Sequence, residues 1–344
     1  MFAKVILIGF GSIGKRHARS IFGICKSLTI IDPNRDALLN LPDGVTSISH
    51  YLTIAELEPS DSLENVVIIA NWGPDHCWAV NECFKLGYRN FVIEKPISSS
   101  LSDLYSLGNL IQENSLRVVV NQGWDSQSLG QRIRELGNKL GLGEPLAVWV
   151  TGGARCASTA GSHYIHLATT VLNESPETVM AHGSSSTINP RGKHLAFYDG
   201  VFSANYKSGK KFSMSFSNMS SIEGEVRILW KDATGEFSND GELIIKGRNP
   251  DREYLNVITR YGRPEVELFS GIPPFKNDLD QDPFFALYRS LKEFSTRALW
   301  DLFERNALSN EILLRMLLSI ELGRQISVDE KIEKHFQDLD YRIS

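Results

Sequence analysis

A glycine-rich turn near the N-terminus constrains the fold of this chain more than any other feature. Four apolar residues at 5–8 predict a short buried strand, and three glycines follow at the spacing GxGxxG. In such a turn the first glycine permits a tight bend, the second lets the backbone approach a pyrophosphate, and the third lets the next helix pack closely. The helix then offers free N–H groups to the phosphates. The pattern predicts a dinucleotide site lined by Gly9, Phe10, Gly11, Ser12, Ile13 and Gly14.

An acidic residue at the end of the next predicted strand, 27–32, supports this site. Asp32 follows Gly9 by 23 residues, and dinucleotide sites place an acid at roughly 20 residues to accept the ribose hydroxyls. Asp32 would repel a 2′-phosphate, whereas the nearby Arg35 could pair with one. We therefore predict NAD as the cofactor, with NADP as the alternative. An ordinary βαβ unit without a nucleotide is the simpler interpretation, but it leaves the matching acid unexplained.

The length and the alternation of elements predict two domains. A chain of 344 residues is too long for one typical core. Apolar strands without polar alternation indicate a parallel, doubly wound sheet that is covered on both faces. We therefore predict a Rossmann domain over residues 1–122. Its further strands are expected at 45–49, 66–70, 90–94 and 117–121, with helices including 76–86 and 101–114.

The pattern changes after residue 122. Alternating segments at 200–206, 211–217, 225–230 and 241–247, separated by turn residues, are typical of an antiparallel sheet. We predict an α+β domain over residues 123–344 with a large, mostly antiparallel open sheet and helices at 127–140 and 162–172. Two amphipathic helices, 283–305 and 309–323, close the domain and are expected to pack back on the first one. Ser309 is predicted to cap the second of these helices.

Composition and charge exclude several classes of protein. The net charge of −5 argues against nucleic-acid binding, which needs a basic surface. No apolar run approaches the ~18 residues of a membrane span, and no signal peptide precedes the first strand. The four cysteines form no CxxC pair, so reduced thiols and no metal site are expected. The chain is predicted to be cytoplasmic, without a membrane or nucleic-acid partner.

Polar residues follow three of the predicted strands. Ligands of doubly wound sheets lie beyond the carboxyl ends of the strands, so these residues are candidates for the cofactor site. They are Asn71, Trp72, His76, Glu94, Lys95 and Asn121. Arg16 and His17, one turn into the first helix, either anchor that helix to neighbouring segments or reach towards the substrate, and the residues alone do not decide between these roles.

With these motifs in view, the chain resembles the Gfo/Idh/MocA family, the glucose-fructose oxidoreductase and inositol dehydrogenase group. The resemblance rests on GFGSIGKRH at 9–17, His76, EKP at 94–96, GSH at 161–163 and GRQISV at 323–328. It implies NAD(P)-dependent hydride transfer to or from a ring carbinol or ketone of a sugar, cyclitol or nucleotide sugar. It also implies a homodimer or homotetramer formed through the sheet of the second domain.

The resemblance assigns roles to individual residues. Lys95 corresponds to the lysine near the nicotinamide and the substrate hydroxyl, and the Lys95–Pro96 bond is a candidate for the cis form. Asn71 and Trp72 would border the nicotinamide, and Asn121 would bind its carboxamide. From the residues alone, a structural bridge between Lys95 and a carboxylate is the alternative.

The acid–base motif departs from the family pattern. The usual Asp-x-Gly-x-His-x-x-Asp reads TAGSHYIH here, so Thr159 and His166 replace the two aspartates and His163 remains. His163 is predicted in the first turn of a helix, where the helix dipole favours a neutral imidazole. Lys95 and His163 are therefore the predicted catalytic residues. The candidate substrate contacts are Arg155, Tyr164, His166 and His194. Because both aspartates are lost, a non-catalytic NAD(P)-binding sensor or regulator of the same fold is the alternative function.

Overall fold

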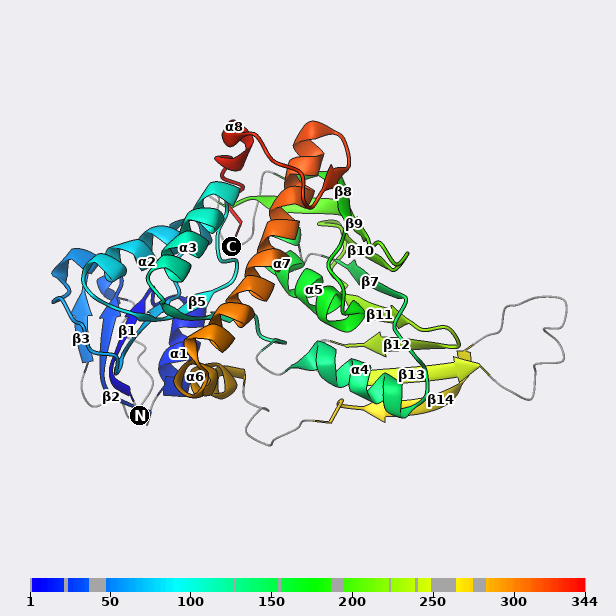
Figure 1. Cartoon of the computed structure of the whole chain (residues 1–344), viewed down its shortest axis with the longest axis horizontal. Helices are drawn as coiled ribbons and strands as arrows, with labels where there is room; N and C mark the ends of the chain where they lie inside the picture. The colour runs from blue at the N-terminus through cyan, green and yellow to red at the C-terminus, as the bar shows by residue number, and fades with distance from the viewer. Residues whose placement is uncertain are drawn as a thin grey trace, which may run out of the picture. The chain divides into compact units, whose positions relative to one another are not determined.

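The chain forms two compact units in a computed structural model. The structure describes residues 2–21, 24–36, 48–125, 128–153, 156–186, 195–222, 224–238, 241–248, 264–274 and 283–343 (Figure 1). The first unit comprises Met1–Ser126, Leu279–Glu311 and Ile332–Ser344, and the second comprises Gln127–Asp278 and Ile312–Lys331. Three separate stretches of the chain therefore build the first unit, whereas the predicted boundary at 122/123 divides the chain only once.

The first unit is built on a parallel sheet with the strand order β3-β2-β1-β4-β5-β6. Its strands are β1 (Phe2–Ile8), β2 (Cys25–Ile31), β3 (Ile48–Tyr51), β4 (Asn65–Ile69), β5 (Asn90–Glu94) and β6 (Arg117–Asn121). From β1 the strands are added toward one edge of the sheet, as β2 and β3, and from β4 they are added toward the other edge, as β5 and β6. Because the crossovers are right-handed, the connecting helices lie on opposite faces in the two halves. This doubly wound sheet confirms the predicted fold class.

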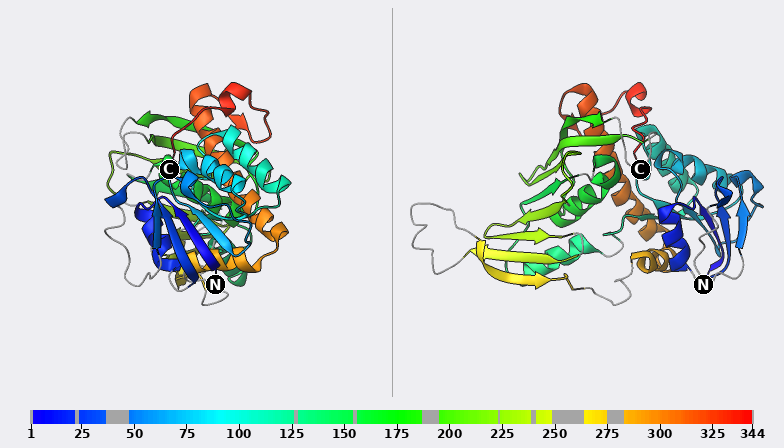
Figure 2. Two further views of the ribbon diagram at one scale, coloured as in Figure 1. Left: turned by 90° about the vertical axis from the view of Figure 1, so that its left-hand side faces the viewer. Right: turned by 180° about the vertical axis from the view of Figure 1, so that it is seen from behind.

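Helices cover both faces of this sheet. α1 (Ser12–Ile21) packs against α6 (Pro283–Glu293) on one face, and α2 (His76–Lys85) packs against α3 (Leu101–Glu113) on the other (Figure 2). The short 3-10 turns η2 (Ile54–Glu56) and η3 (Gly73–Asp75) lie in the loops around β4. Every residue of β4 and β5 is buried, as expected for strands covered on both sides.

The second unit is built on a larger sheet. Its strand order among the described residues is β14-β13-β12-β11-β7-β10-β9-β8-β15. All neighbours are antiparallel except β7 and β10, which run parallel. The strands are β7 (Ala147–Gly152), β8 (Thr178–Ser186), β9 (Phe197–Asn205), β10 (Lys211–Phe216), β11 (Glu225–Leu229), β12 (Ala233–Phe237), β13 (Leu243–Arg248), β14 (Pro264–Gly271) and β15 (Ile326–Ser327). The prediction of a large, mostly antiparallel sheet is confirmed.

One face of this sheet is covered by helices, and the side chains on the other face are exposed or partly exposed. α5 (Ala157–Leu172) packs on β7, β9 and β10, and α4 (Leu129–Lys139) packs on α5 (Figure 1). In β10 and β11 buried side chains alternate with exposed or partly exposed ones, the pattern of a half-covered sheet. The apolar side chains Trp149 and Val201 are 39% and 48% exposed.

The C-terminal helices differ from the prediction. The predicted helix 283–305 is two helices, α6 and α7 (Thr296–Leu322), because Ser295 starts a new one. Its Oγ accepts from the N–H of Ala298 at 3.2 Å and its carbonyl accepts from Leu299. Ser309 does not cap a helix: it is fully buried inside α7, and its hydroxyl donates to the carbonyl of Arg305.

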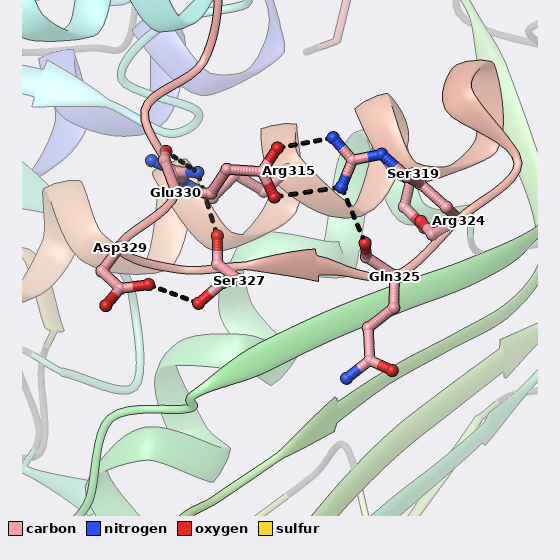
Figure 3. Close-up of polar contacts among 7 residues, drawn as sticks. All are labelled: Arg315, Ser319, Arg324, Gln325, Ser327, Asp329 and Glu330. Carbon is pink, nitrogen blue, oxygen red and sulfur yellow. Dashed lines mark hydrogen bonds and ion pairs between the residues drawn. The ribbon is translucent and has the colours of Figure 1, made fainter.

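The turn after α7 is held by arginines. Arg324 donates to both carboxylate oxygens of Glu330, and the buried Arg315 donates to the carbonyls of Ser327 and Glu330 (Figure 3). These bonds satisfy carbonyl groups that the irregular segment would otherwise leave unpaired. They fix β15 at the edge of the sheet beside β8.

None of the helices in the described ranges is both long and apolar enough to span a membrane.

Candidate functional site

The glycine turn after β1 has the geometry that GxGxxG requires. Gly9 has φ of +89°, in the left-handed region, and a Cβ on it would lie 2.6 Å from the carbonyl oxygen of Ala70. A Cβ on Gly14 would overlap the carbonyl of Gly9. These two glycines therefore allow β1, β4 and the start of α1 to approach one another closely.

Gly11 differs from the other two glycines because space is open beside it. A Cβ on Gly11 would meet no described atom within 4 Å. The first intrahelical bond at this end runs from the N–H of Lys15 to the carbonyl of Gly11, so the first-turn N–H groups of α1 remain available. Open space beside free N–H groups at a helix N-terminus fits a pyrophosphate.

Asp32, directly after β2, is held close to this turn. Its Oδ2 accepts from the N–H of Phe10 at 2.7 Å and its Oδ1 accepts from the N–H of Asn34 at 2.8 Å. His50 on β3 donates to the carbonyl of Asp32 at 2.9 Å. Each carboxylate oxygen has a further lone pair for a ribose hydroxyl. Arg35 is exposed, three residues further along the chain.

A buried polar network lies behind the turn. Nε2 of His17 is 2.7 Å from Oε1 of Glu94, and Asn121 donates to the same oxygen at 2.6 Å. Nδ1 of His17 is 2.5 Å from the hydroxyl of Tyr288 on α6. Nε2–H of the ring donates to the carboxylate, and Nδ1 and the tyrosine hydroxyl share a second hydrogen bond. His17 therefore anchors α1 to β5 and α6, which decides between its two predicted roles.

This network keeps Glu94 ionised. Burial, the largest influence, raises the pKa of Glu94, but it is outweighed by the hydrogen bonds from His17 and Asn121 and by nearby positive charge. The net result is a pKa below the ordinary value of 4.5. The side chain of Glu94 thus binds His17 and Asn121 within the protein, and its predicted contact with the cofactor stays a prediction.

The loops after β4 and β5 are joined by His76. Nδ1 of its ring is 2.8 Å from the carbonyl oxygen of Pro96, and Nε2 is 3.1 Å from that of Asn71. Burial lowers the pKa of His76 below 6.5 despite these carbonyls. Because both nitrogens face backbone, His76 positions the two loops, and its predicted direct contact with the cofactor is untested.

The same two loops carry the remaining candidates of the first unit. Lys95 is partly buried and the Lys95–Pro96 bond is cis. Trp72 is 48% exposed. Oδ1 of Asn71 is buried and has no hydrogen-bond partner among the described residues, which fits a site that a ligand completes. The open space at Gly11 and the unpaired Asn71 oxygen together fit a dinucleotide.

Comparison with known proteins decides the assignment. Residues 3–122 match the model of the Gfo/Idh/MocA oxidoreductase family, described as an NAD-binding Rossmann fold. Residues 3–122 are therefore similar to the NAD-binding part of the Gfo/Idh/MocA family. The resemblance drawn from the motifs is confirmed for this region, and NAD, which the description names, is the predicted cofactor. No curated protein matches the sequence of the chain.

Solved structures resemble the fold of this chain beyond the matched region as well. An oxidoreductase from Agrobacterium radiobacter in complex with NAD+, L-tartaric acid and magnesium has a TM-score of 0.66 at 16% identity, covering 95% of this chain and 99% of the other. A putative myo-inositol dehydrogenase from Sinorhizobium meliloti has a TM-score of 0.64 at 16% identity, and the match covers 95% of this chain and 99% of the other. The WlbA dehydrogenase from Bordetella pertussis, in complex with NADH and UDP-GlcNAcA, has a TM-score of 0.64 at 18% identity. This match covers 96% of this chain and 99% of the other.

The stretch TAGSHYIH, which resembles the acid–base motif of the family in part, lies on α5 of the second unit, and here the predicted start of the helix is corrected. α5 begins at Ala157, five residues earlier than expected, with Cys156 as its N-cap. His163 is therefore in the second turn, beyond the reach of the dipole effect used to argue for a neutral ring. It is partly exposed. Thr159 is in the first turn, and its hydroxyl oxygen lies 3.5 Å from Sγ of Cys156.

Two of the predicted substrate contacts on α5 are buried. Tyr164 is 1% exposed and packs against Phe216, and His166 is 2% exposed. Their roles toward a substrate are untested. Arg155 and His194 lie outside the described residues.

Sequence reasoning missed one member of the site. Tyr288 lies in the predicted amphipathic helix 283–305 and is buried as a core residue would be, but its hydroxyl also completes the network of His17. The signal available was a tyrosine among purely apolar neighbours, since a buried phenol needs a hydrogen-bond partner.

Proposed function

We propose that the chain is an NAD-dependent oxidoreductase that transfers a hydride between the nicotinamide and a ring carbinol or ketone of a sugar, cyclitol or nucleotide sugar. The family assignment of residues 3–122 supports oxidoreductase chemistry. The names of the compared proteins, an inositol dehydrogenase and a dehydrogenase crystallised with a nucleotide sugar, support the substrate class. Asp32 favours NAD over NADP because its carboxylate would repel a 2′-phosphate.

The observation that carries the proposal is the place of Lys95. It lies directly after β5, at the carboxyl end of the strand, on a loop whose Pro96 carbonyl is held by His76. Ligands of a doubly wound sheet bind beyond this edge. Lys95 is also the first residue after Glu94, whose position is fixed by His17 and Asn121.

In this mechanism the chain's own residues bind, orient and move a proton. Gly9, Gly11 and the N-terminus of α1 hold the pyrophosphate, and Asp32 holds the adenosine ribose. Bound NAD supplies the hydride chemistry. Nζ of Lys95 exchanges the proton of the substrate hydroxyl, with His163 as the second candidate for that proton.

A non-catalytic NAD-binding sensor is the second candidate. The observation that favours it is α5, where Thr159 and the buried His166 replace the two family aspartates. Without an aspartate, the motif has no carboxylate to orient His163 or to share a proton with it.

The test separates the two functions. Calorimetry on cofactor-stripped protein should detect NAD+ binding, and a panel of polyols, sugars and nucleotide sugars should give a change in nicotinamide absorbance. Lys95→Ala should keep NAD+ binding but lose about 10²–10⁴-fold in turnover. Lys85→Ala, which removes an exposed lysine paired with Glu82, is the matched control and should change neither. Binding without turnover on the whole panel would favour the sensor, and no binding would reject both.

We propose further that the chain forms a homodimer or homotetramer through the open face of the second-unit sheet. The exposed Trp149 and Val201 on β7 and β9 support this, since both side chains are large and apolar. Light scattering should report a multiple of the monomer mass, and Trp149→Glu should reduce it. The four free cysteines support a reducing compartment, the cytoplasm, as the proposed location.

A further inference from the structure

The loop that carries Lys95 is held by a side chain from a distant helix. Asn310 on α7 forms two hydrogen bonds with the backbone of Ser98: its Oδ1 accepts from the N–H at 3.2 Å and its Nδ2 donates to the carbonyl at 3.0 Å. Both residues are 1% exposed. An amide side chain paired in this way replaces the strand neighbour that the loop lacks after leaving the sheet.

The C-terminal segment holds the next residue of the same loop. Ser99 donates through its hydroxyl to Oδ1 of Asp340 at 2.6 Å, and the N–H of Tyr341 donates to the carbonyl of Ser99 at 3.0 Å. The same Asp340 oxygen accepts from the N–H of Arg342 at 2.9 Å. Tyr341 and Ile343 are buried, so this segment is packed into the first unit.

The segment also reaches the loop after β4. A Cβ on Gly73 would overlap the carbonyl oxygen of Ile343 and would lie 3.2 Å from Cγ of Pro96. Gly73 therefore lies between Pro96 and the end of the described chain. Residues 340–343 contact both loops that carry the candidates for the nicotinamide end of the site, Asn71 and Trp72 on one and Lys95 on the other.

We propose that Asn310 and residues 340–343 are positioning residues that set the loops after β4 and β5 for the nicotinamide end of the cofactor. The inference rests on the proposed function, because it presumes that these loops meet the nicotinamide. The loop backbone at Ser98 and Ser99 is buried, and the carbonyls of both residues are paired by these two segments. Since a buried polar group must stay paired, the loop follows the segments that pair it. Small displacements of catalytic groups cost much of the rate.

The test compares NAD+ with ADP-ribose, which lacks the nicotinamide ring. Calorimetry gives the Kd of each ligand for the full chain and for Ser99→Ala, Asp340→Ala and the double variant. Asp340→Asn, which keeps an acceptor oxygen for Ser99 and Arg342, is the conservative rescue. Glu333→Ala removes an exposed carboxylate from the same C-terminal segment and is the control. Urea unfolding of every variant measures stability separately.

We expect Asp340→Ala to weaken NAD+ binding about tenfold, the scale of one lost hydrogen bond, while ADP-ribose binding changes less than about twofold. Asp340→Asn should restore the NAD+ affinity. Ser99→Ala should weaken NAD+ binding in the same direction, and the double variant should add little to Asp340→Ala, since both single variants remove the hydrogen bond between Ser99 and Asp340. Ser99→Ala, a small change at a serine hydroxyl, carries the test if Asp340→Ala does not fold.

The outcomes separate the two proposals. An unchanged ratio of the two Kd values in Ser99→Ala, with or without a loss of stability, would overturn the positioning role and leave the proposed function intact. A wild-type chain that binds ADP-ribose and NAD+ equally well would also overturn the positioning role. A wild-type chain that binds neither ligand would overturn the proposed function itself, and the positioning role with it.

Discussion

The imidazole of His17 and the carboxylate of Glu94 form a buried pair, with Nε2 of the ring 2.7 Å from Oε1 of the acid. The pair joins the helix that follows the glycine turn to the strand that precedes Lys95. Both parts of the candidate site therefore depend on one interaction, and this interaction depends on the charge of Glu94.

Glu94→Gln should destabilise the chain by about 2 kcal/mol at neutral pH, because a hydrogen bond to a charged group is replaced by a neutral one. The folded pKa of Glu94 is below 4.5, so its contribution is complete above that value and is lost as the pH falls through the folded pKa. Urea midpoints between pH 6 and pH 3 should therefore fall less steeply in Glu94→Gln than in the wild type. The exposed Glu58→Gln is the control, and parallel curves for all three proteins would contradict the prediction.

Gly11→Ala and Gly14→Ala should separate binding from folding. A Cβ at 11 enters open space, so stability should change by less than about 0.5 kcal/mol while NAD+ binding weakens, because the methyl group occupies the pyrophosphate position. A Cβ at 14 overlaps the carbonyl of Gly9 and should cost about 1–3 kcal/mol. Thermal unfolding and calorimetry check both. Normal NAD+ affinity in Gly11→Ala would place the phosphates elsewhere.

Asp32→Asn should lower the preference for NAD+ over NADP+ by about tenfold, or 1.4 kcal/mol. The substitution removes the charge that repels a 2′-phosphate, and one of the N–H groups of Phe10 and Asn34 would then face an amide N–H. The measurement is the ratio of the Kd values for the two dinucleotides. Asp36→Asn, at an exposed acid nearby, should leave the ratio unchanged. The same ratio in both variants would remove Asp32 from cofactor selection.

His76 should make the chain less stable as the pH falls below 6.5. Burial lowers its folded pKa, so the unfolded chain binds a proton that the folded chain does not. The slope attributable to this residue is at most about 1.4 kcal/mol per pH unit. The urea midpoints of the wild type and of His76→Gln should be measured at pH 7.5, 6.5 and 5.5. The difference between the two proteins should become smaller as the pH falls. His335→Gln, at an exposed histidine, should keep the wild-type slope; a His76 variant that also keeps it would contradict the prediction.

The fold of the first unit was predictable where strands are buried on both faces. The predicted strands 90–94 and 117–121 have the same bounds as β5 and β6, because continuous apolar runs between turn residues leave few alternatives. The glycine turn was also predictable, since a Cβ on Gly9 or Gly14 would overlap backbone atoms, and Asp32 follows at the spacing of dinucleotide sites.

The remaining features depend on tertiary contacts that local patterns do not contain. α5 starts at Ala157, although no Ser, Thr, Asp or Asn marks the preceding position and the side chain of Cys156 there makes no capping hydrogen bond. Serine is a residue type that often caps helices, but Ser309 is buried inside α7. The pairing of Asn310 with Ser98 joins residues 212 positions apart. No window of the sequence relates such residues.

The three-segment composition of the first unit has a consequence for biosynthesis. Leu287, Tyr288, Leu291 and Leu299 belong to the same apolar cluster as Val5, Leu28 and Val66. When only β1 to β6 have been translated, the face of the sheet that α6 covers still lacks that helix, and His17 lacks Tyr288 as its partner. The portion of the protein whose translation begins first is thus the portion that becomes complete last.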